Sequence, residues 1–109
     1  AEAVLTLREQ YPEITLEIAI PHDGQTAKWP QSLRDRAERI REEADVITWI
    51  AHEYTKRCLF DRNYYMVSHC SVLLACFDGQ PGDTAQTIET AHRLGRLITV
   101  VRPVRRKAA

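Results

Sequence analysis

Hydrophobic and polar positions along the chain form blocks that predict helices alternating with strands. Apolar residues recur at helical spacing over residues 1–10 and alternate with polar ones over residues 14–20. These two patterns are typical of an amphipathic helix and of a strand with one apolar face. The same alternation continues along the rest of the chain. Further helices are predicted over residues 32–44, over residues 56–69, and from the end of a loop at 78–84 to about residue 94. Further strands are predicted over residues 45–50, 71–77 and 97–101.

Two of the predicted strands differ from the first in their pattern. Residues 71–77 and 97–101 are almost continuously apolar, which is typical of strands that are buried on both faces. We expect two residues to mark the ends of helices. Ser32 is the expected N-cap of the second helix, and Gly95 is expected at the end of the fourth.

The strict alternation predicts an α/β fold, a Rossmann-like parallel sheet with helices on both faces and right-handed crossovers. We expect one domain over residues 1–101, followed by a short basic tail over residues 102–109. Ligands of parallel sheets bind beyond the carboxyl ends of the strands. The loops that could carry function are therefore residues 21–31, 51–56 and 78–84.

The 78–84 loop follows an apolar strand and precedes a helix, as phosphate-binding loops do. Gly79 and Gly82 permit tight turns and a close approach of ligand to backbone. The free N–H groups at the start of the helix favour an anion there, and Thr84 adds a hydroxyl donor. The loop contains neither a Walker lysine nor a GxGxxG pattern. The alternative is an ordinary turn in which Asp83 or Thr84 caps the helix.

A polar residue interrupts the apolar stripe of the third predicted helix. Leu59, Asn63, Met66 and Cys70 fall on one side at steps of four, three and four residues. A buried Asn needs hydrogen-bond partners, so Asn63 either ties neighbouring loops together or faces a ligand. Arg62, its neighbour, could pair with an acidic residue or with a ligand phosphate.

The sequence shows no complete catalytic or metal-binding constellation. His52 and Glu53 follow a predicted strand, where acid–base residues often lie, but no nucleophile stands at a related spacing. The three cysteines, of which Cys70 and Cys76 fall in apolar patterns, are expected to be core residues. We therefore assign no catalytic residue, and we expect neither a metal nor another cofactor.

Composition places the chain among ordinary globular domains. It has 109 residues, a mass of 12.5 kDa, 44% hydrophobic and 28% charged residues, and no net charge. It contains no apolar run of about 18 residues and no signal-peptide pattern, so we expect no membrane partner. The odd number of cysteines without CxxC spacing favours a reducing cytoplasm.

Charge is unevenly distributed between the two ends of the chain. Residues 1–90 hold nine Lys and Arg against fifteen Asp and Glu, whereas residues 91–109 hold six basic residues and no acidic one. The basic end is either a phosphate-binding tail or a solvated terminus. We do not expect a nucleic-acid partner.

Several motifs along the whole chain resemble one protein family. Residues 62–71, RNYYMVSHCS, are similar to an "RNxYMVDxSD" stretch, and residues 78–85, DGQPGDTA, resemble "DGxxGGTA". Ala1-Glu2-Ala3 with Tyr11-Pro12 resembles "WAAEA…YP", and further matches are Pro21 with Lys28-Trp29, and Tyr54 with Cys58. These patterns are those of the YpsA-like proteins of the SLOG superfamily, which also includes the LOG-type phosphoribohydrolases and DprA.

The resemblance implies a Rossmann-like fold and a nucleotide or nucleotide-derived ligand. It implies that Gly82 and Thr84 lie at the ligand phosphate. Our expected ligand-binding residues also include Gly79, Asp83, Arg62, Asn63 and Glu2. Asp83 stands where the family usually has Gly, and its charge opposes a phosphate. LOG-type enzymes carry "PGGxGTxxE" at this loop, whereas here Thr87 stands three residues after Thr84.

The resemblance also implies an upstream strand, helix and strand that do not occur in this sequence. We therefore expect a truncated chain, a split domain, or a sheet completed by a neighbour, because a four-stranded remnant exposes apolar edges. Possible partners are thus a second copy or a completing segment. Three functions remain open: a binding or sensing module for a nucleotide-like molecule, an N-glycosidase acting on nucleoside phosphates, and an interaction domain with a vestigial pocket.

Overall fold

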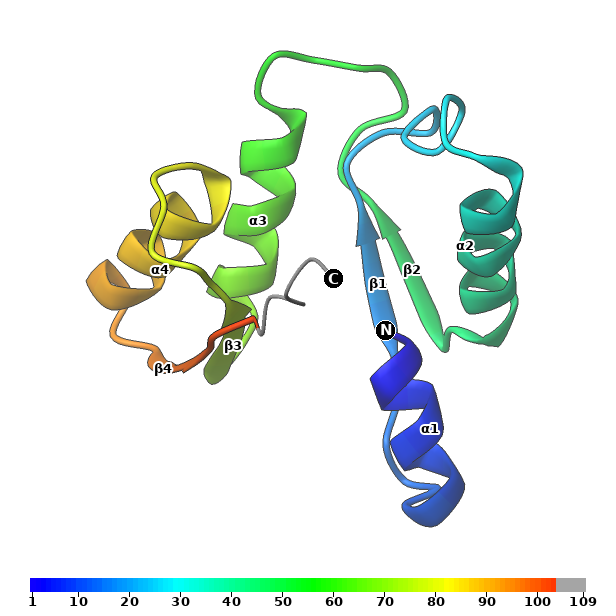
Figure 1. Cartoon of the computed structure of the whole chain (residues 1–109), viewed down its shortest axis with the longest axis horizontal. Helices are drawn as coiled ribbons and strands as arrows, with labels where there is room; N and C mark the ends of the chain where they lie inside the picture. Colours follow the sequence, from blue (N-terminus) through cyan, green and yellow to red (C-terminus); the bar gives the residue numbers. More distant parts are fainter. Residues whose placement is uncertain (104–109) are drawn as a thin grey trace, which may run out of the picture. The chain divides into compact units, whose positions relative to one another are not determined.

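The computed structural model of the protein describes residues 1–103, and the basic residues Arg105, Arg106 and Lys107 of the predicted tail lie outside them. The chain divides into two compact units, Ala1–Arg62 and Asn63–Ala109. The described residues form helices and strands in the predicted alternating order (Figure 1). These are α1 (Glu2–Gln10), β1 (Glu17–Ile20), α2 (Gln31–Glu43), β2 (Val46–Trp49), α3 (Cys58–Ser68), β3 (Val72–Cys76), α4 (Asp83–Arg93) and β4 (Leu97–Val101).

The α/β class and the parallel direction of the strands are confirmed, and each unit contains its own parallel pair. Strand β1 pairs in parallel with β2, and β3 pairs in parallel with β4, which gives two two-stranded sheets among the described residues. Each pair belongs to one unit, with a helix between its two strands as a parallel connection requires. Among the helices of the described part, none combines the length and apolar character needed to cross a membrane.

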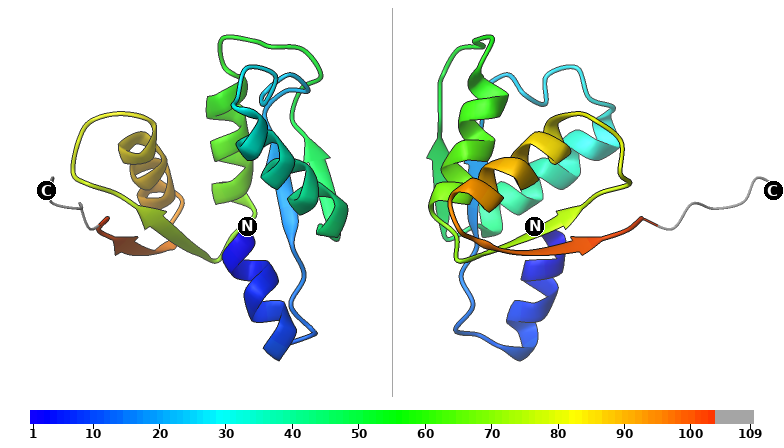
Figure 2. Two further views of the ribbon diagram at one scale, coloured as in Figure 1. Left: turned by 45° about the vertical axis from the view of Figure 1, so that its right-hand side comes forward. Right: turned by 90° about the vertical axis from the view of Figure 1, so that its left-hand side faces the viewer.

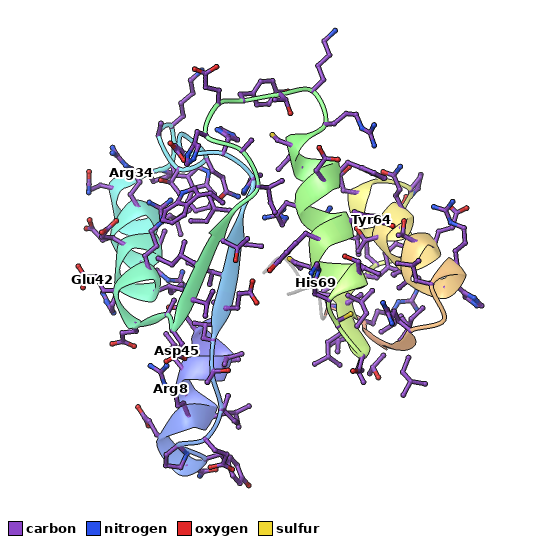
Figure 3. The ribbon with its side chains drawn as sticks, turned by 180° about the vertical axis from the view of Figure 1, so that it is seen from behind. Arg8, Arg34, Glu42, Asp45, Tyr64 and His69 are labelled. Carbon is purple, nitrogen blue, oxygen red and sulfur yellow. The ribbon has the colours of Figure 1, made fainter. Side chains whose placement is uncertain are left out.

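In the first unit, Asp45 fixes the start of the β1–β2 pair. Its carboxylate accepts hydrogen bonds from the backbone N–H of Leu16 at 2.7 Å and from Arg8 Nη1 at 2.9 Å. Figure 3 shows Arg8 and Asp45 side by side where α1 approaches the beginning of β2. The carbonyl of Leu16 accepts from the N–H groups of Asp45 and Val46. Regular pairing thus begins after Leu16, which is why β1 is shorter than the predicted 14–20 strand.

The loops that follow β1 and β2 meet at the carboxyl end of this pair. The N–H of Asp23 donates to the carbonyl of His52 at 3.2 Å. The carboxylate of Asp23 also lies 3.3 Å from Nδ1 of His52. This placement of the 21–31 and 51–56 loops follows from the parallel direction of the strands.

The second unit has its core on one side of the β3–β4 pair. Val67 at the end of α3, Leu73 and Ala75 of β3, and Ala91 of α4 form the buried cluster. Cys70, Ile88 and Ile98 pack against this cluster. Figure 2 shows α4 lying along one side of the two strands.

The prediction that 71–77 and 97–101 are buried on both faces is wrong. Side chains of β3 alternate between buried and exposed, and β4 is mostly exposed. The cause is geometric: successive side chains of a strand point to opposite faces, and the helices of this unit cover one face only. Cys76 is consequently exposed, contrary to the expected core position, whereas Cys58 is buried and Cys70 is half-buried.

Of the two helix ends predicted from the sequence, the end of α4 is confirmed and the start of α2 is not. Helix α2 begins at Gln31 with Pro30 as its N-cap, so the prediction of Ser32 as N-cap is wrong. Proline suits the boundary because its ring fixes φ near the helical value and it has no N–H to satisfy. Gly95 does end α4, with φ of +72°, a conformation that strongly favours glycine.

Candidate functional site

The loop between β3 and α4 lines a pocket of about 360 Å³ within the second unit. Two hydrogen bonds shape the loop. The N–H of Phe77 donates to the carbonyl of Val101 at 3.0 Å, and the N–H of Gln80 donates to the Asp78 carboxylate at 3.0 Å. The lining residues are Cys76, Phe77, Asp78, Gln80, Pro81, Gly82, Asp83, Thr84 and Pro103.

The two glycines of the loop are required by backbone conformation. Gly79 has φ of +89° and Gly82 has φ of +150°, values that other residues rarely adopt. A Cβ atom placed on either glycine would meet nothing within 4 Å. A side chain would therefore fit at either position, and glycine is required only because the turn needs a positive φ. Gly82 lines the pocket, and Gly79 belongs to the same loop without lining it.

Helix α4 opens directly onto this pocket. Its N-cap is Gly82, and no side-chain capping hydrogen bond is formed at this end of the described helix. The interpretation of Asp83 or Thr84 as a helix cap is therefore wrong. The first helical hydrogen bond joins the N–H of Gln86 to the carbonyl of Gly82. The N–H groups of the preceding first turn are thus the donors that an α-helix leaves without an internal acceptor.

Charges beside the pocket oppose each other. The amino end of α4 carries the positive partial charge of the helix dipole. Asp83 places a carboxylate in that same first turn, and the residue is among those that line the pocket. Thr84 supplies a hydroxyl donor to the same wall. The site can receive an anion, but it does so beside a fixed negative charge.

Arg62 and Asn63 lie on α3 at the division between the two units, and both are half-buried. Asn63 does not line the described pocket of its own unit. The predicted apolar stripe is partly wrong, because Leu59 and Met66 are exposed. The buried side chains of this helix are Cys58 and Val67. Nine residues separate these two side chains, so they lie on opposite flanks of the predicted stripe, which the sequence pattern did not single out.

Glu2 lies in the first turn of α1 and is paired with α2. Arg36 donates to both carboxylate oxygens of Glu2, with Nε at 3.3 Å from Oε2. This hydrogen bonding lowers the pKa of the Glu2 carboxyl below its ordinary value, and the charges of Arg36 and Arg39 add to the effect. The three residues border a small pocket of about 170 Å³ in the first unit. A ligand would have to share Glu2 with Arg36.

Sequence reasoning noticed His52 but not the partner that orients it. Asp23 holds Nδ1 of the exposed His52 ring, and His22 beside it packs edge-on against Tyr54 with ring centroids 5.5 Å apart. An imidazole oriented by a carboxylate is a common acid–base arrangement. Within residues 1–103, however, no group of three or more His, Cys, Asp or Glu side chains could hold a metal ion.

Comparison with known proteins gives one consistent result. The model of the YspA SLOG family matches residues 1–96. A UPF0398 protein of Staphylococcus haemolyticus is 31% identical over 80 residues, which are 72% of this chain and 43% of the relative. UPF0398 proteins of Bacillus velezensis and Bacillus pumilus are each 29% identical over 80 residues, covering 44% and 43% of their lengths. The chain thus spans less than half the length of the curated relatives it matches.

Proposed function

The chain belongs to the YspA SLOG family, and on this premise we propose that it binds a nucleotide or nucleotide-derived molecule at the loop between β3 and α4. Its parallel α/β architecture is compatible with a Rossmann-like domain. In such domains, ligands bind at the carboxyl ends of strands. The 78–84 loop stands at the carboxyl end of β3 and fits this rule.

The observation that carries the proposal is the pocket at the start of α4. This helix begins without a side-chain cap, in a turn whose two glycines have positive φ. Backbone N–H groups at such a helix start bind phosphate well, because they are unsatisfied donors within a positive partial charge. The hydroxyl of Thr84 is a further donor to a phosphate oxygen.

Asp83 determines how strongly this site favours phosphate. A carboxylate in the first turn competes with an anionic ligand for the same positive end of the helix. In this proposal Asp83 weakens the binding of phosphate without abolishing it. We propose binding rather than hydrolysis, because the sequence after Thr84 does not follow the LOG-type pattern.

The test is a calorimetric titration of the chain and three variants with adenosine monophosphate. Asp83→Asn removes the charge and keeps the shape, so affinity should rise about two- to fivefold, the effect of one charge at a helix end. Thr84→Val removes a donor and should weaken binding about fivefold, the contribution of one hydrogen bond. Glu89→Gln makes the same change of charge at an exposed position of α4 and should leave affinity within about twofold.

Each contrary result has a distinct meaning. If neither Asp83→Asn nor Thr84→Val alters the affinity, the ligand lies elsewhere and the loop is only a turn. If Asp83→Asn weakens binding, the carboxylate accepts a hydrogen bond from a ligand hydroxyl, and the phosphate is misplaced. Absence of binding would favour an interaction domain with a vestigial pocket. Release of free adenine in the same samples would show hydrolysis and overturn a purely binding role.

A further inference from the structure

A small apolar pocket lies in the first unit, between β1, α2 and the 21–31 loop that joins them. Its volume is about 190 Å³. Figure 1 shows the loop passing from the end of β1 to the start of α2. All residues that line this pocket belong to the unit Ala1–Arg62, and the strand, the helix and the loop each contribute some of them. The pocket is therefore built by one unit alone, and the proposed phosphate site uses none of its residues.

The strand and the helix give this pocket mostly apolar walls. Ile20 of β1 belongs to the lining and is only 4% exposed. Ala37 and Ile40 line it from α2, are half-buried, and fall on the apolar stripe of that helix. Because the side chain of Ala37 is a single methyl group, it leaves space that a larger residue would fill. Apolar cavities of about this size can take up a single aromatic ring.

Trp29 adds an aromatic wall from the loop, and the backbone holds this wall in place. The N–H groups of Gln25, Ala27 and Trp29 each donate to the carbonyl three residues earlier, at 3.2, 3.1 and 3.0 Å. Pro30 follows Trp29 and restricts its backbone further. The indole nevertheless keeps an exposed fraction of 41%. A fixed, partly exposed indole is a suitable surface for stacking of another ring.

The polar residues of the pocket suit both the face and the edge of a heteroaromatic ring. Arg41 contributes a guanidinium group, which binds favourably over the face of an aromatic ring. The amide of Gln25 can donate and accept at the same time, as a ring with a neighbouring donor and acceptor requires. Thr26 adds a hydroxyl group to the same lining. None of the described residues that line the pocket is acidic, so no carboxylate repels an electron-rich ring.

We propose that this pocket binds a small molecule that carries a fused heteroaromatic ring, stacked on Trp29 between β1 and α2. Its volume is below the roughly 300 Å³ at which sites for drug-sized ligands begin, so a single ring system fits. The motif of Pro21 with Lys28-Trp29 then has a structural reason: Pro21 is fully buried at the start of the loop whose other end carries the stacking wall. The proposal does not rest on nucleotide binding at the loop between β3 and α4.

Trp29 is a native reporter for the experiment, because the chain contains only two Trp residues. Trp49→Phe assigns the two indole N–H signals in a proton–nitrogen NMR spectrum. The probe is adenine, and 2-piperidone is the control because it has a neighbouring donor and acceptor but no aromatic face. We expect adenine to shift the Trp29 signal with a dissociation constant of about 1 mM, typical of a ligand of about ten heavy atoms. The Trp49 signal should stay in place, and 2-piperidone should shift neither signal.

Variants assign the shift to the pocket. Ala37→Leu fills the space beside Trp29 and should weaken adenine binding at least about fivefold. Ala27→Leu makes the same change at an exposed position of the loop outside the lining, and should leave affinity within about twofold. Arg41→Met keeps the length of the side chain but removes its charge, so binding should weaken about two- to fivefold. Circular dichroism confirms that the variants are folded.

Three results would overturn the proposal. The first is a Trp29 fluorescence that acrylamide does not quench in Trp49→Phe, since the pocket would then be covered in the whole chain. The second is the absence of a saturable shift with adenine up to about 5 mM. The third is an equal shift with 2-piperidone, or an unchanged affinity in Ala37→Leu. Thr84→Val and Ala37→Leu each change one pocket only, so this proposal and the phosphate site fail separately.

Discussion

At the scale of single residues, Arg96 is the clearest link between separate segments of the second unit. Its Nε donates to the carbonyl of Val67 at 3.1 Å and its Nη2 to the carbonyl of Ser68 at 3.0 Å. These are carbonyls of the last turn of α3, which the helix itself leaves without donors. A cation at a helix carboxyl end is also favoured by the helix dipole. Arg96 thereby holds α3 to the turn before β4.

Replacing Arg96 by Ala should lower the free energy of unfolding by about 1–3 kcal/mol, because two charge-assisted hydrogen bonds are lost. Arg96→Lys should recover only part of this loss, since an ammonium group cannot reproduce the two-pronged geometry. Arg93→Ala serves as control and should cost less than about 0.5 kcal/mol, because Arg93 is exposed and makes one long bond to Thr90. Urea denaturation measures the free energy of unfolding of the three variants. Equal losses for Arg96→Ala and Arg93→Ala would contradict the role given to Arg96.

The pair of Glu2 and Arg36 predicts a pH-dependent contribution to stability. The pKa of Glu2 is lowered in the folded chain by the hydrogen bond from Arg36. The folded state therefore binds a proton less readily than the unfolded chain. The stabilisation is fully present above the ordinary carboxyl pKa and is lost as pH falls through the lowered value. It is small, because both side chains are about half exposed.

The measurement compares wild type with Glu2→Gln by urea denaturation at neutral pH and at about pH 3. The variant should be slightly less stable at neutral pH, and the difference should shrink as the solution becomes acidic. Glu9→Gln makes the same change of charge on the same helix and is the matched control. If the difference in unfolding free energy between wild type and Glu2→Gln grew at low pH, the result would contradict the lowered pKa of Glu2.

At the scale of secondary-structure elements, β3 shows how two neighbouring leucines come to differ. Leu73 and Leu74 are chemically identical and adjacent, yet Leu73 packs in the core and Leu74 lies on the opposite, exposed face of the strand. The pairing register decides which leucine is buried, because shifting a strand by one residue exchanges its faces. Sequence alone could not choose between them, since both faces of the strand are apolar.

Leu73→Ala should therefore destabilise the chain by about 2–4 kcal/mol, the cost of a cavity in a core. Leu74→Ala should change stability by less than about 0.5 kcal/mol, because little buried surface is lost at an exposed position. The two variants are matched controls for each other in one denaturation experiment. Equal losses would mean that both faces of β3 are covered in solution.

The elements were predictable where local patterns decide them. Periodicity placed all of the described helices and strands, and β4 agrees with the predicted 97–101 strand residue for residue. The glycine-rich loop before α4 was found from its turn residues, and its pocket lies there. The contact between Asp23 and His52 joins residues 29 positions apart. No local pattern encodes such a contact, because it arises only when two parallel strands end at the same edge.

At the scale of the whole molecule, each unit contains a two-stranded parallel sheet and leaves large apolar side chains in water. Exposed members include Trp49 and Tyr54 in the first unit, and Leu74 and Leu97 in the second. A sheet of two strands has little apolar surface to bury, and such pairs are marginal without further packing. Within the second unit, the buried cluster is small and consists of Val67, Leu73, Ala75 and Ala91.

This distribution of apolar surface predicts a low heat-capacity change on unfolding. Heat capacity rises when apolar surface becomes hydrated, and side chains already exposed in the native state add nothing. An ordinary globular domain gives about 12–15 cal/mol/K per residue; this chain should fall below that range by roughly a tenth to a quarter. Differential scanning calorimetry at several pH values measures the quantity directly. A value within the ordinary range for the chain alone would mean that the apolar faces are already covered in solution, and it would contradict the exposure on which this prediction rests.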